Sequence, residues 1–212
     1  MKAMLGLSVV CAAALSQAGR LALDFEGALP QGWVAEGTES VPGRSGQGLW
    51  VGPGARLSLP APEFLPQGLD LTLWVCHRQA MADLRFEELV YLYHDTPDMR
   101  NRICLMKRIG TDRIVFAMTD STGNAKGAVF AGNWFAMQSG DLAWDANSWH
   151  ALRITASRAQ GRAALYVDGE QVAAAEGTQF PEVAGTLCIG NWSGRSQALA
   201  VFDDITIAPV GE

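Results

Sequence analysis

Two tryptophans in polar, glycine-containing segments are the side chains of this sequence best placed to contact a ligand. A glycine, Asn133 and Trp134 are consecutive in the sequence, and Trp192 precedes Arg195 in a stretch of Asn, Ser and Gly. The flat face of an indole can stack on a sugar ring, and the ring brings a large apolar area. We expect Trp134, Asn133, Trp192 and Arg195 to bind a ligand. The alternative is that these loop tryptophans close the end of a β domain.

Acidic side chains and histidines do not assemble into a recognisable catalytic group. A retaining glycosidase needs two carboxyl groups about 5 Å apart, a spacing that alternate residues of one strand can supply. The sequence has no Glu-x-Asp-x-x-Glu segment, and Glu87 and Glu88 are neighbours that would point to opposite faces of a strand. His77, His94 and His150 are scattered, and no serine or cysteine lies in a nucleophile-like turn. The sequence therefore leans toward a protein that is not an enzyme.

Residues 1–18 have the pattern of a cleaved signal peptide. Lys2 precedes an apolar run from Ala3 to Leu15, and small residues stand before Gly19. The run is shorter than the roughly 20 apolar residues of a membrane span, and no later segment approaches that length. We expect a secreted or periplasmic protein without a transmembrane segment. Residues 19–212 are enough for one domain with its own core.

The net charge of the sequence excludes two classes of binding partner. The net charge is −6, and Lys107 and Lys126 are the only lysines after the signal peptide. A surface that neutralises phosphates is not expected, which argues against nucleic acid and anionic membranes as partners.

Three cysteines follow the predicted signal peptide, namely Cys76, Cys104 and Cys188, which is an odd number for a protein in an oxidising compartment. Three buried free thiols, or one disulfide and one free thiol, both remain open.

Short apolar runs between Gly, Asp, Asn and Pro clusters predict strands throughout residues 19–212. Many short strands favour two packed sheets over one open sheet. The predicted strands cover residues 21–25, 48–51, 55–59, 69–76, 89–94, 102–109, 113–118, 128–131, 149–156, 162–167, 171–174, 186–189 and 199–207.

Local sequence patterns also predict which strand residues face the core and where two hairpin turns lie. In the run 69–75, alternate residues Leu69, Leu71, Leu73 and Val75 should face the core of the domain. Asp168-Gly169 predicts a two-residue hairpin turn, since such a turn requires positive φ at both central positions. Gly110-Thr111-Asp112 predicts a looser hairpin. Trp74 and Trp149 fall inside predicted strands, where we favour a place in the core.

The order of these segments resembles the laminin-G-like jelly roll of the concanavalin A-like lectin and glucanase superfamily. The segments that carry the resemblance are Asp24-Phe25-Glu26-Gly27, Ser45-Gly46-Gln47-Gly48-Leu49, Leu71-Thr72-Leu73-Trp74-Val75, Ser148-Trp149-His150, Leu165-Tyr166-Val167-Asp168-Gly169-Glu170 and Phe202-Asp203-Asp204-Ile205-Thr206-Ile207. The resemblance implies an all-β, two-sheet antiparallel jelly-roll sandwich over residues 19–212. It does not imply one function, because this superfamily contains lectins, protein-binding modules and hydrolases.

Polysaccharide lyases of the same architecture use a tyrosine or histidine base together with arginines. Tyr91, Tyr93 and His94 are close in sequence, with Tyr91 and Tyr93 expected on one face of their strand, and Arg100 and Arg102 follow. This pattern makes a lyase one alternative. The other is that these tyrosines simply pack at a strand end.

Asp203 is the candidate metal ligand. It shares strand parity with Ile205 and Ile207, so we expect it to point toward the core, where a carboxylate requires a partner. By resemblance, Asp203 would bind one structural Ca²⁺, with Glu26 and the carbonyl groups around Gly46 nearby. A carboxylate that accepts hydrogen bonds from backbone amides, or pairs with an arginine, is equally consistent with the sequence.

Together these observations favour an exported, non-catalytic module that binds a carbohydrate or a glycan-bearing surface. The first alternative is a structural or protein-binding laminin-G-like module whose partner is an extracellular protein surface. The second is a polysaccharide lyase or an atypical glycoside hydrolase.

Overall fold

The structure is a computed structural model that describes residues 19–96, 100–123, 134–183, 185–191 and 197–211. Within these residues the chain forms two antiparallel sheets of eight and seven strands and one short 3₁₀ turn, Leu65–Gln67. The predicted all-β, two-sheet antiparallel sandwich is confirmed. The predicted signal peptide, residues 1–18, and the strand predicted over residues 128–131 lie outside the described residues.

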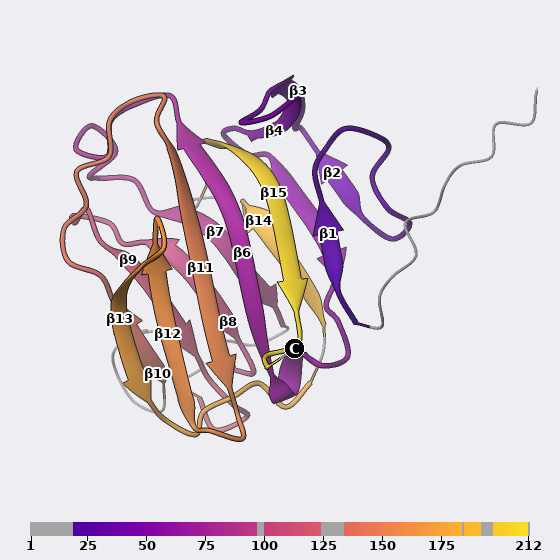
Figure 1. Ribbon diagram of the computed structural model, residues 1–212, viewed down its shortest axis with the longest axis vertical. Helices are drawn as coiled ribbons and strands as arrows, with labels where there is room; N and C mark the ends of the chain where they lie inside the picture. Colours follow the sequence, from indigo (N-terminus) through magenta and orange to yellow (C-terminus); the bar gives the residue numbers. More distant parts are fainter. Residues whose placement is uncertain (1–18, 97–99, 124–133, 184, 192–196, 212) are drawn as a thin grey trace, which may run out of the picture.

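The eight-stranded sheet lies in front in Figure 1 and the seven-stranded sheet behind it. The first has the order β13-β12-β11-β6-β15-β4-β3, with β1 paired to β15, and the second has the order β10-β9-β8-β7-β14-β5-β2. The eight-stranded sheet contains β1 (Leu21–Leu23), β3 (Glu39–Pro42), β4 (Gln47–Val51), β6 (Gly68–His77), β11 (Trp149–Ser157), β12 (Arg162–Val167), β13 (Glu170–Glu176) and β15 (Ala200–Ala208). The seven-stranded sheet contains β2 (Val34–Glu36), β5 (Arg56–Pro60), β7 (Leu89–Asp95), β8 (Ile103–Lys107), β9 (Ile114–Met118), β10 (Phe135–Gln138) and β14 (Thr186–Gly190).

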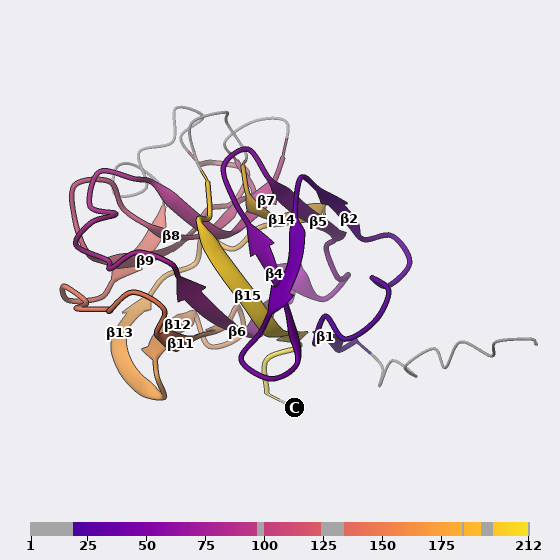
Figure 2. The same ribbon diagram turned by 90° about the horizontal axis from the view of Figure 1, so that it is seen from above.

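Figure 2 shows the ribbon of the two layers from above. Aliphatic side chains at alternate strand positions fill the space between these layers. In β6, Leu69, Leu71, Leu73 and Val75 are fully buried, as the alternation predicted. The intervening residues of β6 therefore point to the outer face of the eight-stranded sheet, meaning the face turned away from the other sheet.

Both hairpin turns predicted from the sequence are present in the structure. Asp168 and Gly169 have φ angles of 51° and 86° and connect β12 to β13, which confirms the two-residue hairpin turn. The looser hairpin between β8 and β9 is also present, because the Arg108 amide donates to the Arg113 carbonyl.

A β-bulge in β7 overturns one predicted arrangement. The register of β7 against β8 shifts between Val90 and Leu92, so Tyr91 and Leu92 both face the core. Tyr93 instead joins an apolar cluster on the outer face of the seven-stranded sheet. The prediction that Tyr91 and Tyr93 share a face was wrong, because one extra residue reverses the alternation.

A second bulge, in β15, changes the direction of Asp203. The register against β6 shifts between Asp203 and Thr206, and Asp204 has a φ of 46°. Phe202 and Ile205 both lie in the core, whereas Asp203 pairs with Trp74 and points to the outer face. The expectation that Asp203 faces the core was therefore wrong, although its side chain is buried, with 1% exposed.

The sequence missed three strands. β2 and β3 are short, largely exposed edge strands, and β3 ends in Pro42, a residue that weakens a strand signal. β10 is four residues long, at the other edge of the seven-stranded sheet. Edge strands need less apolar sequence than central strands, so their periodicity is weak.

Two further sequence expectations can be compared with the described residues. None of their helices is long and apolar enough to cross a membrane. Cys76, Cys104 and Cys188 are free thiols, and burial raises the pKa of Cys104 to about 12.

Candidate functional site

Three tryptophans lie on the outer face of the eight-stranded sheet. Trp50 on β4, Trp74 on β6 and Trp149 on β11 are each half-buried, and we call them the tryptophan platform. Ladder pairs join Trp50 to Val201, Val201 to Cys76, and Cys76 to Trp149. Trp50 and Trp149 are thus separated by three strand spacings of about 4.8 Å, or roughly 14 Å. The core position favoured for Trp74 and Trp149 was wrong.

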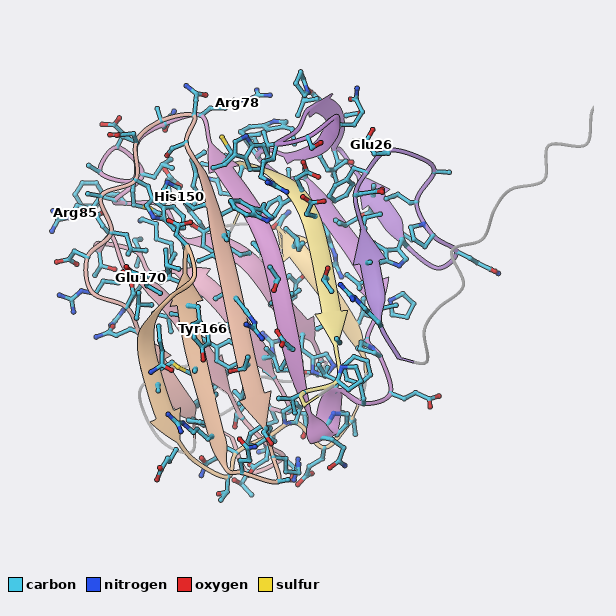
Figure 3. All side chains as sticks on the ribbon, viewed as in Figure 1. Glu26, Arg78, Arg85, His150, Tyr166 and Glu170 are labelled. Carbon is cyan, nitrogen blue, oxygen red and sulfur yellow. The ribbon has the colours of Figure 1, made fainter. Side chains whose placement is uncertain are left out.

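Two arginines cover part of this platform. The Arg78 guanidinium lies 3.9 Å from the ring centroid of Trp50, and the Arg44 guanidinium lies 4.3 Å from that of Trp74. Arg44 also donates to Asp204 at 2.6 Å. Figure 3 shows Arg78 beyond the upper end of β6. The platform therefore combines apolar ring faces with positive charge, an arrangement stabilised by cation–π attraction.

A polar row continues across the same face. Arg153 on β11 donates to both carboxylate oxygens of Asp70, at 2.9 and 2.6 Å, and this contact raises the pKa of Arg153. Its guanidinium also lies 5.7 Å from the ring of Tyr166, which Figure 3 places on β12. The bidentate ion pair holds Arg153 in one orientation beside Tyr166.

An open groove of about 330 Å³ lies beside Tyr166. Its polar lining comes mainly from β11, β12 and β13 and the segment after β11, and includes Thr155, Ser157, Gln160, Arg162, Tyr166 and Gln171. Hydroxyl, amide and guanidinium groups around one aromatic ring can donate and accept hydrogen bonds with a polyhydroxylated ligand.

Ser148, His150 and Asp168 make a hydrogen-bonded chain that sequence reasoning missed. Ser148 Oγ lies 2.8 Å from His150 Nε2, and His150 Nδ1 lies 2.8 Å from Asp168 Oδ2. The His150 ring stacks on Trp144, with centroids 4.2 Å apart and planes 3° apart. The only sequence signal was the Asp168-Gly169 turn, which returns β13 alongside β12 and places Asp168 next to the start of β11.

This chain of contacts has the atomic order of a serine hydrolase triad, but its hydrogen bonds indicate a structural role. The Ser148 hydroxyl donates to the Asp145 carbonyl at 2.6 Å, so its single proton is not directed at His150. The neighbouring amides of Asn147 and Ser148 already donate to the carbonyls of His77 and Asp145. They are not available to stabilise an oxyanion.

The tyrosines and the histidine considered as the base of a lyase are buried. Tyr91 and His94 are 0% exposed, and Tyr93 is 2% exposed. Burial raises the pKa of Tyr91 and lowers that of His77 to about 4. Tyr91 lies 3.0 Å from His77 Nε2 inside the core, so its hydroxyl cannot reach a polysaccharide and act as a base.

The predicted ligand-contact residues are not brought together by the described part of the structure. Trp134 is half-buried and packs against the apolar cluster that contains Val90 and Tyr93, on the outer face of the seven-stranded sheet. Its indole N–H is buried without an acceptor among the described residues. Asn133, Trp192 and Arg195 lie outside the described residues.

The predicted metal-site residues meet at one turn. Asp203 Oδ2 accepts the amides of Arg44 and Ser45 at 2.8 and 3.2 Å, and its Oδ1 accepts the amide of Asp204 at 2.8 Å. Glu26 Oε1 accepts the Gln47 amide at 2.7 Å. A Cβ on Gly46 would overlap this Glu26 oxygen, at 1.9 Å. Glu26 and Asp203 therefore both fasten the turn between β3 and β4.

A buried ammonium orders a loop at the edge of the molecule. Lys107 is 0% exposed, and its Nζ donates to the carbonyls of Leu84, Arg85 and Glu87 at 2.6, 3.1 and 3.0 Å. Burial lowers the pKa of Lys107. The loop held in this way exposes Phe86, 78% of which is accessible.

One part of the platform was accessible to sequence reasoning. The alternation that placed Leu73 and Val75 in the core requires Trp74, between them, to point outward. Trp50 and its contact with Arg78 could not be foreseen, because the two residues meet only when β15 is inserted between β4 and β6.

No family model matches the chain, and no curated protein matches it. Solved structures do resemble it. Domain 4 of AbnA, an extracellular arabinanase from Geobacillus stearothermophilus, in complex with arabinotriose, has a TM-score of 0.57 at 11% identity, over 83% of this chain and 81% of that one. The botulinum neurotoxin serotype G binding domain has a TM-score of 0.60 at 11% identity, over 88% and 46%. Mouse laminin alpha1 domains LG4-5 have a TM-score of 0.51 at 16% identity, over 80% and 40%. The chain thus spans less than half of the last two.

Proposed function

Because the chain has a laminin-G-like, concanavalin A-like jelly-roll fold, we propose that it is a glycan-binding module whose contact surface is the outer face of the eight-stranded sheet. One observation carries the proposal: Trp50, Trp74 and Trp149 lie partly exposed on one sheet face. Apolar surface that is rimmed by polar residues on a soluble domain commonly marks an interaction site. Tyr166 and the groove beside it extend the same face.

Support also comes from the similar structures. The arabinanase domain was solved with arabinotriose, and the neurotoxin domains are binding domains. At 11% identity these similarities show a shared fold but do not identify a ligand of this chain. The choice of the sheet face therefore rests on the exposed side chains of this chain.

The test is a glycan array followed by calorimetry on each positive glycan. We expect Trp50→Ala, Trp74→Ala and Tyr166→Ala each to weaken binding on the order of tenfold, since aromatic contacts contribute about 0.5–1.5 kcal/mol beyond area burial. Phe86→Ala is the matched control, because Phe86 is an exposed aromatic residue that is not on this face. Binding to no glycan, or equal losses in all four variants, would contradict the proposal.

A protein-binding module is the second candidate, favoured by Phe86 and Ile109. Their side chains are 78% and 56% exposed. The Gly110 amide donates to the Arg85 carbonyl at 2.7 Å, so the segments that carry the two side chains lie together. Capture of an extracellular protein partner that is lost in Phe86→Ser, with no glycan bound, would favour this function.

A structural Ca²⁺ is a separate proposal. It is supported by the kind of atoms at this turn, because Glu26, Asp203 and the carbonyls around Gly46 offer the oxygen ligands that a hard cation prefers. Each of the three carboxylate oxygens described above already accepts an amide, so the turn has hydrogen bonds without an ion. We expect chelator to lower the melting temperature and Ca²⁺ to restore it, with no response in Asp203→Asn.

Export is likewise proposed, from residues 1–18 alone. The amino-terminal mass of protein recovered outside the cytoplasm tests it, and a mature chain that begins at Gly19 is the expected result.

A further inference from the structure

We infer that Trp50 and Arg78 form a subsite for an anionic sugar unit, one that carries a carboxylate or a sulfate group. This inference rests on the proposed function and names the class of ligand. It depends on the contact of the Arg78 guanidinium with the Trp50 ring, and on the lack of a carboxylate partner for Arg78 among the described residues.

Arg78 differs from Arg44 and Arg153, the two other arginines that lie over aromatic rings of this face. Arg44 pairs with Asp204, and Arg153 pairs with Asp70. Arg78 is exposed and, within the described part of the chain, has no carboxylate partner; its guanidinium lies over the Trp50 ring at 3.9 Å. It is therefore a positive charge that is held in place but not neutralised.

Trp50 is fixed beneath it. A Cβ on Gly52 would lie 2.6 Å from Trp50 Nε1, so the indole edge occupies the space that a side chain would take. Gly52 thus leaves room for this orientation of the indole, and an indole that has this orientation before binding limits the ordering entropy that binding must overcome.

The position of Arg78 discriminates between neutral and anionic ligands. A sugar ring that stacks on Trp50 must move the guanidinium aside and forfeit a cation–π contact of about 0.5–1 kcal/mol. A neutral sugar offers no compensating charge. An anionic sugar offers the displaced guanidinium a charge-assisted, bidentate acceptor, which is stronger than the contact it replaces.

Neighbouring groups set the direction of the ligand. Glu39 on β3 is the ladder partner of Trp50 and is exposed. It repels an anion on its own side and accepts hydrogen bonds from hydroxyl groups. The anionic group therefore lies toward Arg78 and the neutral hydroxyls toward Glu39. Trp149, on the same row, extends the site beyond a single sugar ring.

The experiment compares acidic oligosaccharides with neutral counterparts of the same backbone. The probes are oligogalacturonate against its methyl ester, and sulfated against unsulfated galactan oligosaccharides, titrated by calorimetry at two NaCl concentrations. We expect at least one acidic probe to bind tenfold or more tightly than its neutral counterpart, with a preference that shrinks in high salt. Arg78→Gln should abolish the preference, Arg78→Lys should keep part of it, and Glu39→Gln should increase it. Arg85→Gln is the matched control and should leave the preference intact, since Arg85 is an exposed arginine on the loop that carries Phe86 and not on this face.

The outcomes separate this inference from the proposed function. Neutral probes bound as tightly as acidic ones, or a preference unchanged in Arg78→Gln, would overturn the anionic subsite and leave glycan binding in place. No binding of any glycan, acidic or neutral, would overturn both. Circular dichroism and melting temperatures of the variants show that each is folded, and these surface substitutions should change neither.

Discussion

The Tyr91 hydroxyl lies 3.0 Å from Nε2 of His77 and joins the two sheets across the core. His77 Nδ1 donates to the Leu199 carbonyl at 2.9 Å, so in the neutral ring Nε2 must accept the proton of Tyr91. Both side chains are buried, and burial lowers the pKa of His77 to about 4. The bulge that turns Tyr91 inward therefore supplies a polar link between the two sheets inside the core.

Removing this hydroxyl should destabilise the protein. Tyr91→Phe leaves His77 Nε2 buried without a donor, which costs about 1–3 kcal/mol of unfolding free energy. Denaturant unfolding measures the change. Tyr166→Phe, the same substitution at a half-exposed tyrosine, should lie within about 0.5 kcal/mol of the wild type. Similar losses in both variants would contradict a special role for the Tyr91 hydrogen bond.

Stability should fall in mildly acidic solution because of His77. Its pKa is near 6.5 when unfolded and about 4 when folded. The unfolded chain therefore binds the proton first, and stability declines as pH falls from about 6.5 to about 4, by on the order of 3 kcal/mol. Unfolding free energies measured at several pH values show this slope. His77→Gln should be less stable at pH 7 but should lose less between pH 6.5 and 4, and an unchanged slope would count against His77.

Two glycines allow a controlled test of the turn between β3 and β4. Gly46 and Gly54 have φ angles of 65° and 72°, but a Cβ would overlap Glu26 only at Gly46 and would meet nothing within 4 Å at Gly54. Gly54→Ala should cost about 1–2 kcal/mol through backbone strain alone. Gly46→Ala should cost more, because Glu26 must also leave the Gln47 amide. In a Glu26→Ala background the two alanine substitutions should become equal, and a difference that persists there would show that Glu26 is not the cause.

The Lys107 ammonium should be essential to the loop over residues 84–87. Lys107→Met leaves three carbonyls without their donor, and we expect a loss of roughly 2–4 kcal/mol. Faster exchange of the Glu87 and Gly110 amides, which bond to carbonyls of the same loop, should accompany it. Arg85→Ala removes a neighbouring exposed cation and serves as the control. A Lys107→Met protein with the melting temperature and exchange rates of the wild type would refute this role.

Alternation of apolar residues was enough to predict the architecture and most strands, because central strands such as β6 and β11 must bury one side chain in two. The same alternation predicted the wrong face where a β-bulge adds one residue to a strand. At Tyr91 and at Asp203 a bulge reverses the faces, and nothing in the sequence around them signals the insertion. The contact surface was harder still. Trp50 and Arg78 are separated by 27 intervening positions and meet across β15, a strand from the end of the chain.

Lys107 has one more consequence. Many loops are organised by a diffusible cation, and such a loop opens when the ion is diluted or chelated. Here the cation at the centre of three carbonyls is part of the polypeptide, so it is tethered and cannot dissociate. The order of the segment that carries Phe86 is thereby independent of the supply of metal ions in the surroundings.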